Sequence, residues 1–407
     1  MAEPLRLLSL DGGGVRGLST IKILKHMMTM ISNERGRQVN PWEVFDMMGG
    51  TSTGGLLAIM LGRLRMSVDE CEEAYLDLSR NIFKSRRTES NIFGRGSDFL
   101  QANGKFSTEE LEAAIKGIVR SKSNTEDTLL REDSAPPCRV FVCAATASTS
   151  THTNLRSYKT RFLPDFNSEK CTIWEACRAT SAATGFFEPI TIGSCGQRFI
   201  DGAITYNNPV QLVYNEAQDI FGQSRADNAI LVSIGTGRGP LKPFQGNLKN
   251  IVEAMKKLMT DSQKAHDDFS NSHHSMVDRN LFFRFNVYPG LEDVGLHEYA
   301  QVGKIESATE DYLKNGDTLR VFNRCIRMLL LEPQGSTVDL RSPELFDTTR
   351  TPLTPTVPGS RGEPEFQEHP IPSLEPTRTI STAPTSADER VAHLLRAQYS
   401  DPSRFCM

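Results

Sequence analysis

The chain of 407 residues is predicted to form an α/β domain in three layers, with helices on both faces of a largely parallel central sheet. Two observations support this fold class. Short apolar segments alternate with helical patterns over residues 5–331, as in successive βαβ units. Two glycine-rich turns, residues 11–17 and 50–54, each connect an apolar segment to a helical one, and sheets of this kind place their sites at such turns.

The composition changes at Glu332. About half of the chain's 21 prolines lie beyond this residue, among serine, threonine and glutamate. Segments of this composition bury too little apolar surface to fold. We therefore expect residues 1–331 to form the folded domain and residues 332–407 to form a disordered tail.

The predicted strands are short runs of mainly apolar residues, bounded by glycine or polar residues. The runs before Asp11 and Gly50 each end at a glycine-rich turn, and a later run ends at Asp201. In chain order, the predicted strands cover residues 5–10, 44–49, 138–146, 155–162, 199–200, 229–236 and 281–287.

The predicted helices show apolar residues three or four positions apart, and Ser107-Thr108-Glu109-Glu110 opens one of them with a capping pattern. Residues 85–105 are polar and contain glycine, so we expect a surface loop there, with a flap at a lipid surface as the alternative. In chain order, the other predicted helices cover residues 18–31, 55–61, 66–84, 173–184, 210–220, 247–270, 298–314 and 317–331.

The overall composition is that of an ordinary soluble chain, since 38% of the residues are hydrophobic and 24% are charged. The formal net charge of -4 argues against nucleic acid as a main partner. No signal peptide is visible, and no stretch approaches the roughly 18 apolar residues of a membrane span. The eight cysteines are scattered without C-x-x-C pairs, which indicates reduced thiols and no zinc site. We expect a cytoplasmic protein.

Gly50-Thr51-Ser52-Thr53-Gly54 has the G-x-S-x-G pattern of a nucleophilic serine on a sharp turn between strand and helix. A serine hydroxyl becomes a useful nucleophile only when it is held exposed beside a base. The small flanking residues allow the bend, and the following helix directs its free N–H groups at the site. A glycine-rich turn whose serine merely caps a helix has the same pattern, so this motif alone does not decide the chemistry.

The loop Asp11-Gly12-Gly13-Gly14-Val15-Arg16-Gly17 offers uncovered backbone N–H groups to an anion. One candidate is a nucleotide phosphate, because Gly12, Gly14 and Gly17 match the dinucleotide fingerprint. That fingerprint requires an acidic residue at a strand end about 20 residues later. Glu34 falls near that distance but in a polar helix end, so the match is weak. The other candidate is the oxyanion that forms when a serine attacks an ester carbonyl.

The base that would serve Ser52 is not obvious from the residues alone. In Asp201-Gly202-Ala203, an aspartate follows a strand and two tiny residues follow it, so its carboxylate is free to approach another side chain. Asp-Gly is also a common turn pair. A Ser-Asp-His triad needs a histidine downstream, and none of the candidates has a distinctive neighbourhood. These candidates are His266, His273, His274 and His297. The sequence leaves open a dyad or a triad with an unmarked histidine.

Together, the glycine loop, the serine turn and Asp201-Gly202-Ala203 resemble the three motifs of the patatin-like phospholipases, in the same order and with similar spacing. Asn207-Asn208-Pro209 matches a further common feature of that family. The resemblance covers residues 5–330 and is strongest to a fungal branch similar to calcium-independent phospholipase A2. It implies a patatin-like acyl hydrolase domain over residues 1–331.

The resemblance implies a Ser–Asp dyad in which Ser52 attacks an acyl ester and Asp201 accepts its proton. The backbone N–H groups of Gly12, Gly13, Gly14 and Thr53 would hold the oxyanion. No metal or cofactor is implied, the substrate would be a phospholipid or another glycerolipid, and the membrane contact would be transient. Arg16 would brace the loop or lie near a phosphate. The other supporting motif residues are Asp11, Gly17, Gly50, Gly54, Gly202 and Ala203.

Two readings from other classes remain beside this one. The loop from Gly12 to Gly17 would serve a phosphoanion- or nucleotide-binding protein, in which binding survives the loss of Ser52. A catalytically silent interaction module would not need an intact nucleophile, base and oxyanion loop, and the chain has all three motifs.

Overall fold

The central element of the fold is a mixed β-sheet. The computed structural model describes residues 3–83, 106–160, 170–193, 196–238 and 249–331, with the backbone alone for 249–260. These residues lie in the first of two units, Met1–Val338. The predicted tail, residues 332–407, and the predicted loop, residues 85–105, lie outside the described residues.

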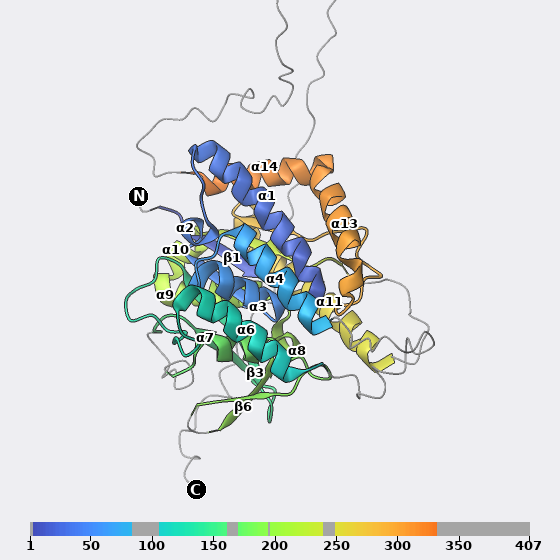
Figure 1. Ribbon diagram of the computed structural model, residues 1–407. Helices are drawn as coiled ribbons and strands as arrows, with labels where there is room; N and C mark the ends of the chain where they lie inside the picture. The colour runs from blue at the N-terminus through green and yellow to red at the C-terminus, as the bar shows by residue number, and fades with distance from the viewer. Residues whose placement is uncertain (1–2, 84–105, 161–169, 194–195, 239–248, 332–407) are drawn as a thin grey trace, which may run out of the picture. The chain divides into compact units, whose positions relative to one another are not determined.

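The sheet has the strand order β5-β6-β3-β2-β1-β7-β8, and β4 pairs with β3 away from this path (Figure 1). Strands β3, β2, β1, β7 and β8 pair in parallel, which confirms the predicted fold class. Strands β4, β5 and β6 pair antiparallel, which the local sequence pattern does not indicate. The strand bounds are β1 Arg6–Leu10, β2 Met47–Thr51, β3 Arg139–Thr146, β4 His152–Arg156, β5 Ile190–Ile192, β6 Gln197–Asp201, β7 Ile230–Ile234 and β8 Phe282–Phe285.

Helices cover both faces of the sheet. In β2, a side chain at Gly49 would point at Val213 of helix α9, whereas Gly50, the next residue, faces helix α3. Since successive residues of a strand point to opposite faces, α3 and α9 lie on opposite sides. Helices α1, α4 and α6 pack side by side on the α3 face (Figure 1). The helix bounds are α1 Gly17–Arg35, α2 Pro41–Val44, α3 Thr53–Ala58, α4 Val68–Phe83, α6 Thr108–Ser123, α7 Ile173–Thr180, α8 Ala203–Tyr206, α9 Val210–Phe221, α10 Gln223–Asp227, α11 Lys249–Ser272, α12 His274–Asp278, α13 Val302–Lys314 and α14 Gly316–Leu329.

Capping groups fix several of these helices where the sequence places them. The Ser107 hydroxyl accepts a hydrogen bond from the Glu110 amide at 3.1 Å and begins α6, as the capping pattern predicts. Gly36 ends α1 in the left-handed conformation, with φ of 63°, and its amide bonds to the Asn33 carbonyl. Over the described ranges, no helix combines the length and the apolar character needed to span a bilayer.

Several predicted elements have the wrong bounds. The strand predicted over residues 44–49 is β2, Met47–Thr51, because Val44 still belongs to the short helix α2. The strand predicted over residues 155–162 is β4, His152–Arg156, because the short turn after β3 starts the antiparallel pairing at once. The helix predicted over residues 173–184 is α7 and ends at Thr180. Beyond Thr180, the carbonyl of Ala182 accepts the amide of Asp201 at 3.0 Å, so the chain leaves the helix to bond with the end of β6.

The ends of β2 and β6 meet on strand β3. Residues 141–143 of β3 have β2 on one side and β4 on the other. Ala144 and Ala145 of β3 still pair with β4, so β6, their second neighbour, lies on the β2 side. Thr51 is opposite Cys143, and Asp201 is opposite Ala144. The two strands therefore run toward each other and bring Ser52 and Asp201 together at their tips.

Candidate active site

Ser52 lies on the sharp turn between β2 and α3. Its backbone has φ of 54° and ψ of −125°, a conformation that costs a residue with a side chain about 1–3 kcal/mol. The Ser52 amide donates a hydrogen bond of 2.9 Å to the hydroxyl of Thr180, which itself donates to the carbonyl of Cys143 at 2.7 Å. Thr180 thus fastens the strained turn to β3.

Asp201 is the carboxylate that lies beside Ser52. The residue is only 5% exposed, and its carboxylate accepts a hydrogen bond from the Ala203 amide at 2.8 Å. Burial raises the pKa of Asp201 to about 7, although the neighbouring Ser52 hydroxyl and the Ala203 amide oppose the rise. A carboxylate with this pKa both accepts and returns a proton at neutral pH.

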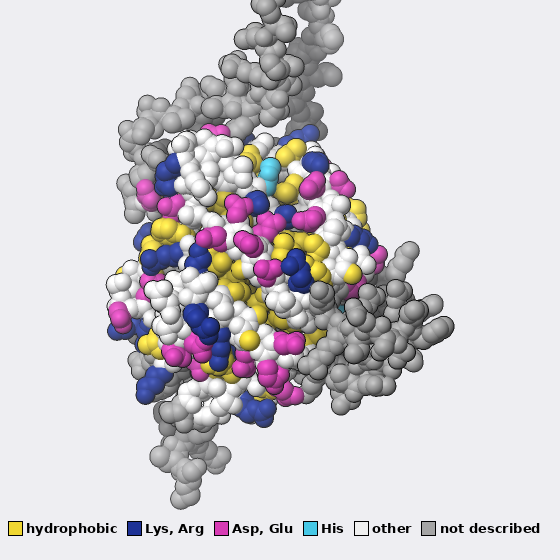
Figure 2. All heavy atoms as spheres, viewed as in Figure 1, with side chains coloured by type: hydrophobic (Ala, Val, Ile, Leu, Met, Phe, Trp, Pro, Cys, Tyr) yellow, Lys and Arg dark blue, Asp and Glu magenta, His cyan; other side chains and the backbone are white. Residues whose placement is uncertain are grey.

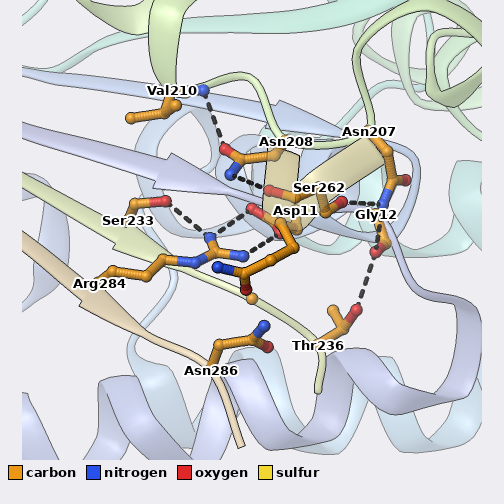
Figure 3. A network of polar contacts seen from close by, with 12 residues as sticks. Asp11, Gly12, Asn207, Asn208, Val210, Ser233, Thr236, Ser262, Arg284 and Asn286 are labelled. Atoms are coloured by element: carbon orange, nitrogen blue, oxygen red, sulfur yellow. Dashed lines mark hydrogen bonds and ion pairs between the residues drawn. The ribbon is translucent and has the colours of Figure 1, made fainter. Parts of the chain in front are cut away.

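The glycine loop lies directly against Ser52, since a side chain at Gly12 would collide with Asn207 and approach Ser52. The Gly12 amide donates to the Asn207 carbonyl at 3.0 Å. The Gly12 carbonyl accepts from the Thr236 hydroxyl at 2.8 Å and from the Asn207 side chain at 3.3 Å (Figure 3). The Gly12 amide is therefore committed inside the fold, and Gly12 contributes to the predicted oxyanion hole by holding the loop rather than by donating.

The amides of Gly13, Gly14 and Thr53 have no acceptor among the hydrogen bonds of the described residues. Thr53 opens α3, and a first helical residue has no acceptor within its own helix. The carbonyl of Gly14, where φ is 53°, accepts from Thr53 Oγ1 at 3.1 Å and from the Tyr75 hydroxyl at 2.5 Å. These two bonds tie the glycine loop to the serine turn. The amides of Gly13 and Gly14 therefore lie near Ser52.

Asp11 and Arg16 brace the two ends of the loop. Asp11 forms a buried ion pair with Arg284 of β8, with N–O distances of 2.6 and 2.8 Å, and Arg284 also donates to Ser233 of β7 (Figure 3). Arg16 is buried, and its Nε donates to the carbonyl of Val294 at 2.6 Å. Burial lowers the pKa of Arg16 to about 10, against nearby acidic residues. Of the two predicted positions for Arg16, the structure supports the bracing one.

An apolar pocket opens beside Ser52. Its volume, counted together with its solvent-filled mouth, is about 600 Å³. Hydrocarbon side chains from α3, α4 and α6 form one side of it, and the segment after α7 forms another. The residues that line it are Gly14, Ser52, Thr53, Leu56, Tyr75, Leu78, Ser79, Ile82, Leu111, Ser181, Ala183, Phe186, Phe187, Leu296 and His297. None of these lining residues is lysine, arginine, aspartate or glutamate, so the pocket suits a hydrocarbon chain.

The four candidate histidines are in different surroundings. His297 lines the pocket. His273 stacks on Phe269 with ring centroids 4.1 Å apart, and His266 packs on Phe282 at 5.5 Å. His274 begins the short helix α12. The carboxylate of Asp201 lies beside the Ser52 hydroxyl, which lowers the pKa of that carboxylate.

Several residues that position the site have no distinctive sequence signal. Thr180 is one helical threonine among many, and Tyr75 and Thr236 are equally ordinary in sequence. Asn207 stands in a noticeable Asn-Asn-Pro run, but the sequence does not reveal that its side chain holds Gly12. Over the described part of the chain, His, Cys, Asp and Glu side chains form no cluster of three that would hold a metal ion.

Comparisons with known proteins find phospholipases that are similar to this chain. Phospholipase A I of Arabidopsis thaliana is 27% identical over 381 residues, which cover 81% of this chain and 28% of that protein. Human calcium-independent phospholipase A2-gamma is 26% identical over 299 residues, 69% of this chain and 34% of that protein. The cGAMP-activated phospholipase of Vibrio cholerae is 28% identical over 247 residues, 58% of this chain and 65% of that protein.

The chain thus spans about a third of the length of the first two relatives. The resemblance to a fungal branch stays a prediction. The patatin-like phospholipase family profile matches residues 8–214, half of the 407 residues, and this region contains the glycine loop, Ser52 and Asp201. The chain belongs to the patatin-like phospholipase family.

Proposed function

We propose that this protein is a lipid acyl hydrolase that cleaves acyl esters of glycerophospholipids without a metal ion. The observation that carries the proposal is the position of the Ser52 hydroxyl beside the buried carboxylate of Asp201, close enough to lower the pKa of that carboxylate. This pair lies between free backbone amides and an apolar pocket. A nucleophile with its base, an oxyanion site and a place for a hydrocarbon chain are the parts that ester hydrolysis of a lipid requires.

In the acylation step, Ser52 Oγ attacks the ester carbonyl while its proton passes to Asp201. The carbonyl oxygen becomes an oxyanion, and the amides of Gly13, Gly14 and Thr53 donate to it. The intermediate collapses when the C–O bond to the lipid alcohol breaks, and Asp201 returns the proton to that leaving oxygen. The products are the lysolipid and an acyl-Ser52 ester.

In the deacylation step, water attacks the acyl-Ser52 carbonyl and gives a proton to Asp201. The second intermediate uses the same oxyanion site. When the bond to Ser52 breaks, Asp201 returns the proton to Ser52 Oγ, and the fatty acid leaves. Asp201 therefore acts as base and acid in each half-reaction, which its pKa of about 7 allows.

We further propose that the protein works in the cytoplasm and touches membranes transiently. The six cysteines of the described residues are free and buried, as expected for a reducing compartment. Figure 2 shows hydrophobic side chains gathered in a band over the region of α4 and α6, the helices that supply Leu78, Ile82 and Leu111 to the pocket. Flotation with liposomes under conditions of lipid turnover tests this contact, and hydrolysis without any flotation would contradict it.

The proposal is tested by fatty-acid release from a phosphatidylcholine with different acyl chains at its two positions. We expect release by the full chain in the presence of a calcium chelator, and none by Ser52→Ala or Asp201→Ala. Ser181→Ala, which removes another pocket hydroxyl, is the matched control and should remain active. Failure to cleave phospholipid and soluble esters would refute the proposal. Nucleotide binding that survives Ser52→Ala would then favour the phosphoanion-binding alternative.

A further inference from the structure

The pocket beside Ser52 has one wall built from rings rather than from hydrocarbon chains. Phe186 and His297 line the pocket, with their ring centroids 6.1 Å apart. Phe106 packs behind both, at 5.8 Å from Phe186 and 6.2 Å from His297. The three rings form a triangle that joins segments far apart in the sequence, and we call it the aromatic triangle.

The backbone holds His297 firmly at this position. One residue before it, the carbonyl of Leu296 accepts the amide of Val15 at 2.8 Å, directly beside the glycine loop. Arg16 donates to the carbonyl of Val294 at 2.6 Å, and the Gly295 amide donates to the Glu298 carboxylate at 2.9 Å. The imidazole therefore has a fixed place relative to the loop that borders Ser52.

The two phenylalanines are also held. The amide of Phe106 donates to the carbonyl of Phe186 at 2.9 Å, which fixes the start of α6 against the segment after α7. Burial lowers the pKa of His297, against the charge of Glu298, and so favours the neutral form of its ring. A neutral ring backed by phenylalanine presents a rigid, uncharged wall to whatever fills the pocket.

We propose that His297 is the specificity-determining residue that limits the acyl chain, with the aromatic triangle as the stop behind it. This inference rests on the proposed function and adds the residue that selects among its substrates. Removal of the imidazole would open the pocket toward Phe106, a ring that does not itself line it. Longer acyl chains would then bury additional methylenes, and one methylene in a hydrophobic pocket changes the specificity ratio about tenfold or more.

The test compares His297→Ala, His297→Phe and wild type on phosphatidylcholines with acyl chains of graded length and on a short soluble ester. We expect His297→Ala to raise the ratio of kcat/KM for the longest chain to that for the shortest by about tenfold. His297→Phe restores a ring of similar size and should keep the wild-type ratio. His274→Ala, outside the pocket, is the matched control.

Two results would overturn the proposal. The first is an unchanged chain-length profile in His297→Ala, which would show that the ring does not limit the chain. The second is loss of short-ester hydrolysis in both His297 variants while they remain folded, which would make His297 a catalytic member of a triad.

A binding experiment separates this proposal from the proposed function. Fatty acids of graded length would displace a fluorescent fatty acid from Ser52→Ala and from Ser52→Ala/His297→Ala. A shift toward longer fatty acids in the double variant would support the stop at His297 even if the wild type hydrolysed no ester. Identical profiles would refute the stop even if hydrolysis were observed.

Discussion

Two carboxylates, Asp201 and Glu216, are equally buried but have different surroundings. Each is 5% exposed. Asp201 accepts a hydrogen bond from the Ala203 amide and has the Ser52 hydroxyl as a neutral neighbour, and burial raises its pKa to about 7. Glu216 of α9 accepts from Arg156, from the Tyr158 hydroxyl at 2.6 Å and from Asn154 at 2.9 Å. Burial alone would raise the pKa of Glu216, but these donors, Arg156 first, bring it below its usual value.

The comparison shows that depth of burial does not decide the role of a carboxylate. Glu216 has a guanidinium partner and enough donors to stay ionised, so it serves as a fixed link between α9 and β4. Asp201 has only neutral donors, so its charge is poorly compensated and its proton is exchangeable near neutral pH. The pKa of Asp201 is high because no cation is among its described hydrogen-bond donors.

The largest expected effect is a difference in kcat between variants of Asp201 and variants of Glu216. Asp201→Asn keeps the shape of the side chain but removes the base, so kcat should fall by about 10³-fold or more. Glu216→Gln, the matched carboxylate-to-amide change, should leave kcat of the folded protein within a few-fold. Steady-state turnover of a soluble ester measures both, and equal losses would show that Asp201 has no special role.

The next largest expected effect is a loss in the free energy of unfolding when Glu216 loses its cationic partner. Arg156→Met leaves Glu216 buried without its cation, which should cost about 3–5 kcal/mol of the free energy of unfolding. Urea denaturation of wild type and variant measures this loss. Arg320→Met removes an exposed partner of Asp317 and should cost about 1 kcal/mol or less. A comparable small loss for Arg156→Met would contradict the account of Glu216.

Stability should depend on pH in opposite ways at the two sites. The pKa of Asp201 in the folded protein, about 7, exceeds its ordinary value of 3.8. The bound proton therefore stabilises the native state fully below pH 3.8, and this contribution is lost as pH rises from 3.8 to about 7. Asp201→Asn should therefore gain stability relative to wild type between pH 4 and pH 8, by up to about 4 kcal/mol.

For Glu216, the folded pKa lies below the ordinary 4.5, so its contribution is present above pH 4.5 and is lost in acid. The stability deficit of Glu216→Gln should accordingly shrink as pH falls below about 4.5. Denaturation curves across the pH range test both trends, and parallel trends for the two variants would refute the comparison.

The pH dependence of the reaction should follow Asp201. Because the base must be ionised, kcat/KM for a soluble ester should rise about tenfold per pH unit below an apparent pKa near 7 and level off above it. A profile that is flat down to pH 5 would show that Asp201 titrates like an ordinary aspartate.

The smallest expected effect concerns Thr180, which fastens Ser52 to β3. Thr180→Val removes one hydroxyl and its two hydrogen bonds, so kcat should fall by roughly fivefold to tenfold at little change in KM. Thr180→Ser keeps the hydroxyl and should restore the rate. If both variants lose activity equally, packing rather than hydrogen bonding explains the role of Thr180.

The sequence predicts which motifs make up this site better than it predicts how they are held together. Local pattern suffices for the turn at Ser52, because a strand, small residues and a helix follow each other within a few positions. It does not reveal that Asp201 arrives on an antiparallel strand, since pairing with β3 is decided by residues distant in the chain. The Gly12 amide donates to the carbonyl of Asn207, about 195 positions later in the chain. His297, which lines the pocket, is likewise distant in sequence from Ser52. Such contacts have no local signal.

The order of the strands has a consequence for synthesis on the ribosome. Ser52 emerges first, Asp201 much later, and Arg284, which holds Asp11 at the base of the glycine loop, comes from the last strand of the sheet. A nascent chain that ends before β8 has the nucleophile without its complete support. The buried carboxylate of Asp11 gains its cation only when this last strand joins the sheet, so the glycine loop reaches its final form late in synthesis.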